Sequence, residues 1–90
     1  MRVAFTVHGY VQGVGYRYYV RDEAEVLGLA GWVRNAYDGT VTGEAEGEAA
    51  LLEVLKRLLE QGPRMARVKR LDWSELDGAE SLPRPVQIRR

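Results

Sequence analysis

Hydrophobic and polar residues alternate along the first part of the chain and then change their period. Over residues 2–8 every second position is hydrophobic, which is the pattern of a strand with one buried face. Over residues 16–27 hydrophobic side chains recur every three or four positions, which predicts an amphipathic helix. Gly28 then suits a left-handed C-terminal cap. The chain is therefore predicted to begin with a strand and a helix, joined by a glycine-rich segment.

The middle of the chain predicts a hairpin followed by a second helix. Residues 29–36 and 40–46 read as strands on either side of the Asp38-Gly39 pair, which is typical of a tight hairpin. The second of these strands alternates small apolar residues with Thr and Glu, so its inner face suits a position close under a helix. Residues 48–61 carry leucines at helical spacing, and Gly62-Pro63 ends that helix.

The last third of the chain predicts a strand with an irregularity. The hydrophobic positions of residues 65–73 change parity halfway along, and a β-bulge near Lys69 and Arg70 would restore one inward face. Residues 76–85 are polar and rich in turn formers, which predicts a loop. Residues 86–90 form a short segment in which hydrophobic and polar positions alternate, which suits an edge strand.

This order of elements predicts an α+β fold, the ferredoxin-like split βαβ arrangement (βαββαβ). Two helices would cover one face of a mainly antiparallel four-stranded sheet, with a short fifth strand at its edge. Ninety residues form a single domain, residues 1–90, which buries about 60% of the surface that the unfolded chain exposes. The same topology serves enzymes, RNA-binding modules and ligand-binding domains, so the function must be argued from particular residues.

Composition and charge exclude several classes of function. Thirteen basic and thirteen acidic residues cancel, which argues against a general nucleic-acid binder. No hydrophobic run approaches the roughly 20 residues of a membrane span, and the N-terminus lacks a signal-peptide pattern, so we expect a cytoplasmic protein without a membrane partner. The chain has no cysteine, which excludes disulfides, thiolate nucleophiles and cysteine-based zinc sites. With no obvious apolar surface stripe, we expect a monomer.

The glycine-rich segment, residues 9–17, is the strongest candidate for chemistry. A glycine turn that leads into a helix directs backbone N–H groups at one point, and the helix dipole adds partial positive charge there. Arg17 would add a bidentate cation. Glycines before a helix are often no more than a tight turn, but an arginine in the first helical turn opposes the dipole, which disfavours a purely structural role for it.

Asn35 is the second candidate, because it stands near the end of the second predicted strand. A right-handed helical crossover makes the first two strands parallel, so their carboxyl ends lie at the same edge of the sheet. The glycine loop and Asn35 are therefore expected to face each other. A turn residue before the hairpin is the alternative interpretation of Asn35.

At these positions the sequence resembles the acylphosphatase family. The motifs that carry the resemblance are Gly9-x-Val11-Gln12-Gly13-Val14-x-Tyr16-Arg17, Gly31-Trp32-Val33-x-Asn35 and Asp38-Gly39-Thr40-Val41. The resemblance implies a cytoplasmic hydrolase that cleaves small acyl phosphates to a carboxylate and inorganic phosphate, without a metal or another cofactor. By motif position, Arg17 would bind the phosphate and Asn35 would orient the attacking water.

Two positions depart from the family pattern. Tyr16 replaces the usual phenylalanine, which we expect to add a hydroxyl at the rim of the pocket. Pro85 stands where the family more often has glycine and an aromatic residue, which leaves the start of the last strand open.

The chemistry of phosphoryl transfer fits these residues. Charge on the equatorial oxygens must be held by prealigned donors, and the loop amides with the Arg17 guanidinium supply them. The phosphate-binding residues are expected to be Gln12, Gly13, Val14, Gly15, Tyr16 and Arg17. The side chain of Gln12 is expected to support the loop rather than touch the ligand. A leaving carboxylate, with a pKa of about 4 for its acid, needs no general acid.

Three alternatives remain open from the sequence alone. A non-catalytic acylphosphatase-like module would use the same loop to bind phosphate or a phosphopeptide, although a chain of 90 residues disfavours it. An RNA-binding domain would need exposed aromatics on its central strands, whereas Phe5 has inward parity. His8 precedes the loop and could act as an acid or base, but a solvent-facing strand position explains it equally well.

Overall fold

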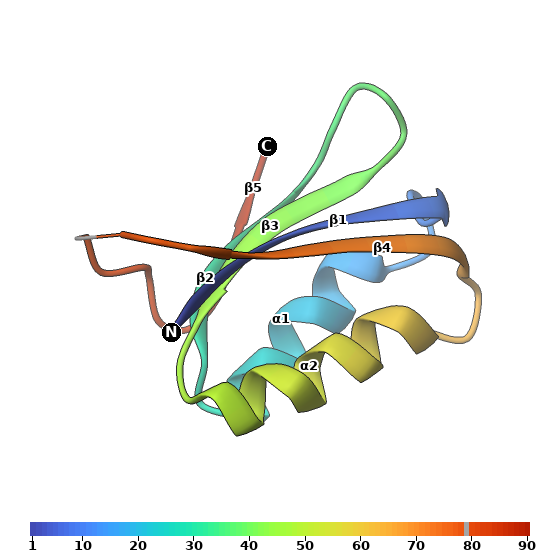
Figure 1. The fold of residues 1–90 in the computed structure, drawn as a ribbon. Helices are drawn as coiled ribbons and strands as arrows, with labels where there is room; N and C mark the ends of the chain where they lie inside the picture. Colours follow the sequence, from blue (N-terminus) through green and yellow to red (C-terminus); the bar gives the residue numbers. More distant parts are fainter. Residues whose placement is uncertain (79) are drawn as a thin grey trace.

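The computed structural model describes residues 1–78 and 80–90 and confirms the predicted order of elements. Figure 1 shows both helices on one face of a single twisted sheet. Within the described residues, no helix is long and apolar enough to cross a membrane. The elements are β1 (Arg2–Tyr10), α1 (Tyr16–Val26), β2 (Ala30–Asn35), β3 (Val41–Glu46), α2 (Ala49–Gln61), β4 (Arg67–Leu76) and β5 (Gln87–Arg89).

The sheet places the ends of β1 and β2 at the same edge. Its strand order is β4-β1-β3-β2-β5, and β3 runs antiparallel to both β1 and β2. β1 and β2 are therefore parallel to each other, as the crossover rule predicts. The short β5 pairs in parallel with β2 and gives the sheet its fifth strand. The ferredoxin-like prediction is confirmed, and the loops that follow β1 and β2 lie on one edge.

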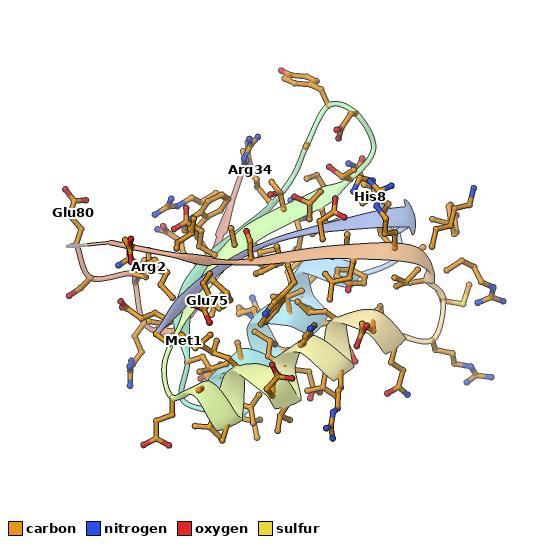
Figure 2. The ribbon with its side chains drawn as sticks, in the orientation of Figure 1. Met1, Arg2, His8, Arg34, Glu75 and Glu80 are labelled. Carbon is orange, nitrogen blue, oxygen red and sulfur yellow. The ribbon has the colours of Figure 1, made fainter. Side chains whose placement is uncertain are left out.

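The core lies between the sheet and the two helices. Val3, Phe5 and Val7 of β1 face the helices and are at most 2% exposed, and each contributes roughly 1.5–3 kcal/mol by its burial. The other face of the sheet is polar. Figure 2 shows His8 and Arg34 pointing away from the helices on that open face.

The predicted bulge in β4 is confirmed. His8 of β1 pairs with Arg70, but the next residue, Gly9, pairs with Val68, so Lys69 is the inserted residue. The insertion brings the hydrophobic residues on either side of it to the helix-covered face. Beyond the bulge, the Trp73 ring stacks on Phe5 with the centroids 6.4 Å apart.

The hairpin between β2 and β3 is wider than the Asp-Gly pair suggests. Five residues separate the strands, and the Ala36 N–H donates to the Thr40 carbonyl at 2.9 Å. Within this loop the Asp38 carboxylate accepts hydrogen bonds from the Thr40 hydroxyl at 2.6 Å and from its backbone N–H at 3.1 Å. These bonds, the hydroxyl first, lower the pKa of Asp38. The Asp38 side chain closes the turn, so a loop longer than a two-residue hairpin turn is stable here.

Candidate active site

The loop between β1 and α1 has the backbone geometry of an anion nest. Gly13 and Gly15 take left-handed φ angles of +73° and +79°, and Val14 between them does not. A Cβ at either glycine would meet no atom within 4 Å, so glycine is required there by the backbone angle and not by space. Val11 is 1% exposed and anchors the start of the loop in the core. Successive N–H groups in such an alternation converge on one side.

The first turn of α1 leaves its N–H groups without side-chain partners. Gly15 is the N-cap, no side chain among the described residues caps the helix, and the first turn holds no acidic residue. The Tyr19 N–H makes a helical bond back to the Gly15 carbonyl at 3.0 Å. The amides that precede Tyr19, including that of Arg17, point out of the helix towards its positive end. Loop and helix together form a site suited to a phosphate group.

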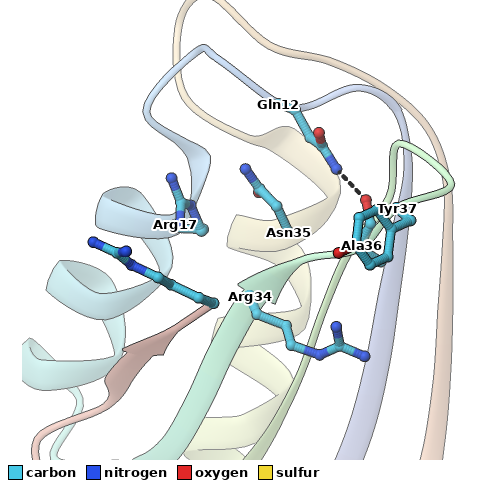
Figure 3. Close-up of a pocket in the computed structure, with 7 residues that line it drawn as sticks. Gln12, Arg17, Arg34, Asn35, Ala36 and Tyr37 are labelled. Atoms are coloured by element: carbon cyan, nitrogen blue, oxygen red, sulfur yellow. Dashed lines mark hydrogen bonds between the residues drawn. The ribbon is translucent and has the colours of Figure 1, made fainter.

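Two cavities meet at the side chains of Arg17 and Asn35. Figure 3 shows these side chains next to each other, Arg17 from α1 and Asn35 from the end of β2. The smaller cavity, about 230 Å³, is lined by Val11, Gly13, Gly15, Tyr16, Arg17, Tyr18 and Asn35. The larger cavity, about 570 Å³, is lined by Gln12, Arg17, Arg34, Asn35, Ala36, Tyr37 and Arg90. Arg17 and Asn35 are the residues common to both linings.

Gln12 ties the loop to the hairpin. Its side-chain amide donates to the Ala36 carbonyl at 2.7 Å and to the Thr40 carbonyl at 2.9 Å (Figure 3). Both amide hydrogens are therefore committed to the hairpin, in agreement with the expected supporting role. Val14, the remaining residue of the predicted set, lines neither cavity and packs against the core. The side-chain N–H groups of Gln12 are therefore not available to a ligand, and the polar groups that Val14 could offer are those of its backbone.

Tyr16 corrects one expectation from the sequence. Its hydroxyl does not lie at the rim of the pocket, because the residue is 1% exposed and the hydroxyl donates to the Leu59 carbonyl of α2 at 2.5 Å. Pro63 stands four residues after Leu59 and has no N–H, so this carbonyl lacks its helical donor. Tyr16 supplies the missing hydrogen bond and fixes the start of α1 against the end of α2. Burial, with a smaller contribution from Tyr19, raises the pKa of Tyr16.

Replacing Tyr16 with phenylalanine is expected to lower the free energy of unfolding by about 1–3 kcal/mol, because the buried Leu59 carbonyl loses its partner. In a domain of this size each kcal/mol lowers the melting temperature by roughly 4–8 °C. The difference should shrink above about pH 10, where the unfolded chain ionises Tyr16 and the folded chain keeps it neutral. Urea unfolding at neutral and alkaline pH measures both effects.

Tyr19→Phe is the matched control. The Tyr19 hydroxyl donates to the Leu58 carbonyl at 2.8 Å, but that carbonyl also accepts the Gly62 N–H at 2.8 Å. Its loss leaves no unsatisfied carbonyl, so we expect a cost of about 0.5–1 kcal/mol. Equal destabilisation by the two substitutions would contradict the special role of Tyr16.

The sequence did not indicate two arginines of the larger cavity, Arg34 and Arg90. Arg34 lies near the end of β2 and borders the cavity. Arg90 comes from the C-terminal end of the chain, where the sequence predicts a short edge strand but not the strand with which it pairs. The signal that was missing is the parallel pairing of β5 with β2, which aligns Arg34 with Arg89. Arg90 therefore follows at the same edge as Asn35.

His8 lies outside the candidate site. Its Nε2 is 2.8 Å from an Asp72 carboxylate oxygen and 3.0 Å from Nη2 of Arg70, on the open face of the sheet (Figure 2). The hydrogen bond from His8, followed by that from Arg70, lowers the pKa of Asp72. His8 lines neither of the two cavities. Its partners account for the residue as part of the sheet surface.

Comparison with known proteins places this fold and sequence in one family. The family model for acylphosphatase matches residues 3–84. An acylphosphatase of Nocardioides sp. is 49% identical over 87 residues, covering 97% of this chain and 86% of that protein. One from Thermococcus kodakarensis is 44% identical over 84 residues, covering 91% of this chain and 92% of that protein.

Solved structures agree with this comparison. The crystal structure of acylphosphatase from Bacillus subtilis superposes with a TM-score of 0.93 at 34% identity, covering 99% of this chain and 98% of that one. Full-length HypF in its phosphate- and nucleotide-bound form also matches, with a TM-score of 0.86 at 27% identity, but this chain covers only 12% of it. On the sequence match, the fold and the motifs together, the chain belongs to the acylphosphatase family, whose members are enzymes.

Proposed function

We propose that this acylphosphatase hydrolyses acyl phosphates by direct attack of water on a phosphoryl group held between Arg17 and the glycine loop. The observation that carries the proposal is that Arg17 and Asn35, from separate elements, line both cavities beside the uncapped start of α1. Gly13 and Gly15 border the smaller cavity, so their backbone is available to the same ligand. An anion cradle and an uncharged amide thus meet at one point.

The cradle would stabilise the transition state by charge. In phosphoryl transfer negative charge spreads over the equatorial oxygens of the phosphoryl group, and prealigned donors lower the barrier without reorganising. The backbone N–H groups at the start of α1 are such donors, and the planar guanidinium of Arg17 can hold two oxygens at once. The removal of a single donor of this kind typically costs about 10²–10³ in kcat.

Asn35 would set the direction of attack. Its side-chain carbonyl can accept a hydrogen bond from water, while its NH₂ donates to a phosphoryl oxygen or to the solvent. The water oxygen forms a bond to phosphorus, and the bond between phosphorus and the acyl oxygen breaks. The electron pair leaves with the carboxylate, which stays unprotonated because its acid has a pKa of about 4. The proton of the water passes to an oxygen of the released phosphate. No general acid is required.

The substrate in this proposal is a small molecule, and the proposed oligomeric state is a monomer. The balanced charge gives no reason to invoke a nucleic-acid partner. The cytoplasm remains the proposed location.

A turnover assay with a chelator tests the proposed function. Purified protein should hydrolyse benzoyl phosphate at the same rate with and without EDTA, and inorganic phosphate should inhibit competitively, because both anions occupy the cradle. A chain that binds phosphate but releases no benzoate would instead be a binding module, the alternative that its similarity to part of HypF keeps open. Loss of activity with EDTA would contradict the metal-free mechanism.

A further inference from the structure

The larger cavity carries more positive charge than is needed to bind the phosphoryl group. We propose that Arg90 binds a carboxylate on the acyl group, with Arg34 adding positive charge from the other side of the end of β2, so that the enzyme prefers acyl phosphates derived from dicarboxylic acids. This inference rests on the proposed function, because it assigns the acyl end of the same substrate. It predicts that the enzyme is selective for the acyl group of its substrate.

The two cavities divide the substrate between them. The smaller one is lined by the glycine backbone and Arg17, which suit the phosphoryl group, and neither Arg34 nor Arg90 borders it. The larger one begins at the same Arg17 and Asn35 and, at about 570 Å³, falls within the ~300–1,000 Å³ of small-molecule sites. A phosphoryl group held at the junction would therefore direct its acyl group into the larger cavity.

The pairing of β5 brings Arg90 to this cavity. Val33 and Ile88 are aligned across the parallel pair and both face the core, so the residues two positions further on follow the same face. These residues are Asn35 and Arg90. Arg90 is thus carried to the side of the sheet on which Arg17 lies. Figure 3 shows the Arg34 side chain pointing away from Arg17, so Arg34 borders the larger cavity from the side opposite to Arg17.

No acidic side chain neutralises these arginines in the part of the chain that the structure describes. The carboxylates that pair with arginine serve Arg2, Arg21 and Arg70, and the lining of the larger cavity contains no Asp or Glu. A carboxylate on the acyl group would supply the missing partner in bidentate geometry. Arg89 next in sequence differs, because its guanidinium lies 5.1 Å from the centre of the Trp32 ring and it donates to Gln87.

The test compares two isosteric substrates, 4-carboxybenzoyl phosphate and 4-carbamoylbenzoyl phosphate, which differ by one negative charge. Their intrinsic reactivities cancel when the ratio of kcat/KM is compared between variants. We expect Arg90→Gln to lower the ratio of kcat/KM for the carboxylate substrate to that for the carboxamide substrate by about three- to tenfold. Arg34→Gln should lower it by about twofold. These effects are small because partly exposed ion pairs contribute little. The wild-type ratio should also fall as salt is raised.

Arg89→Gln is the matched control, since it removes the same charge one residue away without touching the cavity, and it should keep the wild-type ratio. Equal ratios in Arg90→Gln and Arg89→Gln would overturn the inference. So would an Arg90→Gln variant that loses both substrates equally, because Arg90 would then act on the phosphoryl group.

Binding of non-hydrolysable analogues separates this inference from the proposed function. If no acyl phosphate is turned over, the proposed function fails, but calorimetry with 4-carboxyphenylphosphonate and 4-carbamoylphenylphosphonate still reports on the cavity. The wild type should bind the carboxylate analogue about three- to tenfold more tightly, and Arg90→Gln should remove most of that preference. Equal affinity of the wild type for the two analogues would refute the subsite directly.

Discussion

Asn35→Ala is expected to lower kcat for benzoyl phosphate by about 10²–10³, because the attacking water is then no longer held in line with the phosphorus–oxygen bond that breaks. The inhibition constant of inorganic phosphate should change by less than about threefold, since the loop amides and Arg17 carry that affinity. Steady-state kinetics with phosphate as the inhibitor measure both quantities. The split between a large loss of rate and a small loss of binding is the signature of a positioning group.

Asn35→Asp sharpens this experiment. The carboxylate keeps an acceptor for the water at the same place but sets a negative charge beside the phosphoryl group. We expect it to weaken phosphate inhibition as well as turnover, because like charges repel at short range. Asn35 is the last residue of β2 and no hydrogen bond ties its side chain within the described structure, so neither change should unfold the protein. Wild-type turnover in Asn35→Ala would show that the water-positioning role is wrong.

The sequence predicted most of the fold because local patterns and the topology agree. Alternation over β1, helical spacing over α1 and α2, and the parity change in β4 each lead to the observed element. The crossover rule then brings the glycine loop and Asn35 to one edge without knowledge of any contact. The proposed catalytic pair was therefore visible in the sequence as a consequence of strand direction.

The features that the sequence missed depend on pairings between distant segments. Arg90 reaches the larger cavity only because β5 pairs in parallel with β2, and a strand of three residues gives no periodicity from which to predict its partner. The direction of the Tyr16 hydroxyl likewise depends on α2, where Pro63 leaves the Leu59 carbonyl without a donor. The sequence does not show that β5 pairs with β2. It also does not show that the Tyr16 hydroxyl meets the end of α2.

Substitution of Arg17, unlike that of Asn35, should reduce binding and rate together. We expect Arg17→Lys to lower kcat/KM for benzoyl phosphate by about 10² and to weaken phosphate inhibition by about tenfold, because lysine keeps the charge but loses the bidentate fork. Arg17→Gln, which also removes the charge, should lower kcat/KM by about 10³ or more. Both substitutions therefore reduce binding and rate together, which Asn35→Ala does not.

Arg21 provides the control for these substitutions, because it lies one helical turn further along α1. Its guanidinium pairs with Asp22 at 3.0 Å and lies 5.1 Å from the centre of the Tyr18 ring, and it lines neither cavity. Arg21→Lys makes the same chemical change in the same helix, so it should leave kcat/KM and phosphate inhibition within about twofold of the wild type, as exposed ion pairs contribute little. If Arg17→Lys behaved like Arg21→Lys, the phosphoryl group would be held by charge and loop amides alone. The guanidinium geometry would then have no part in the mechanism.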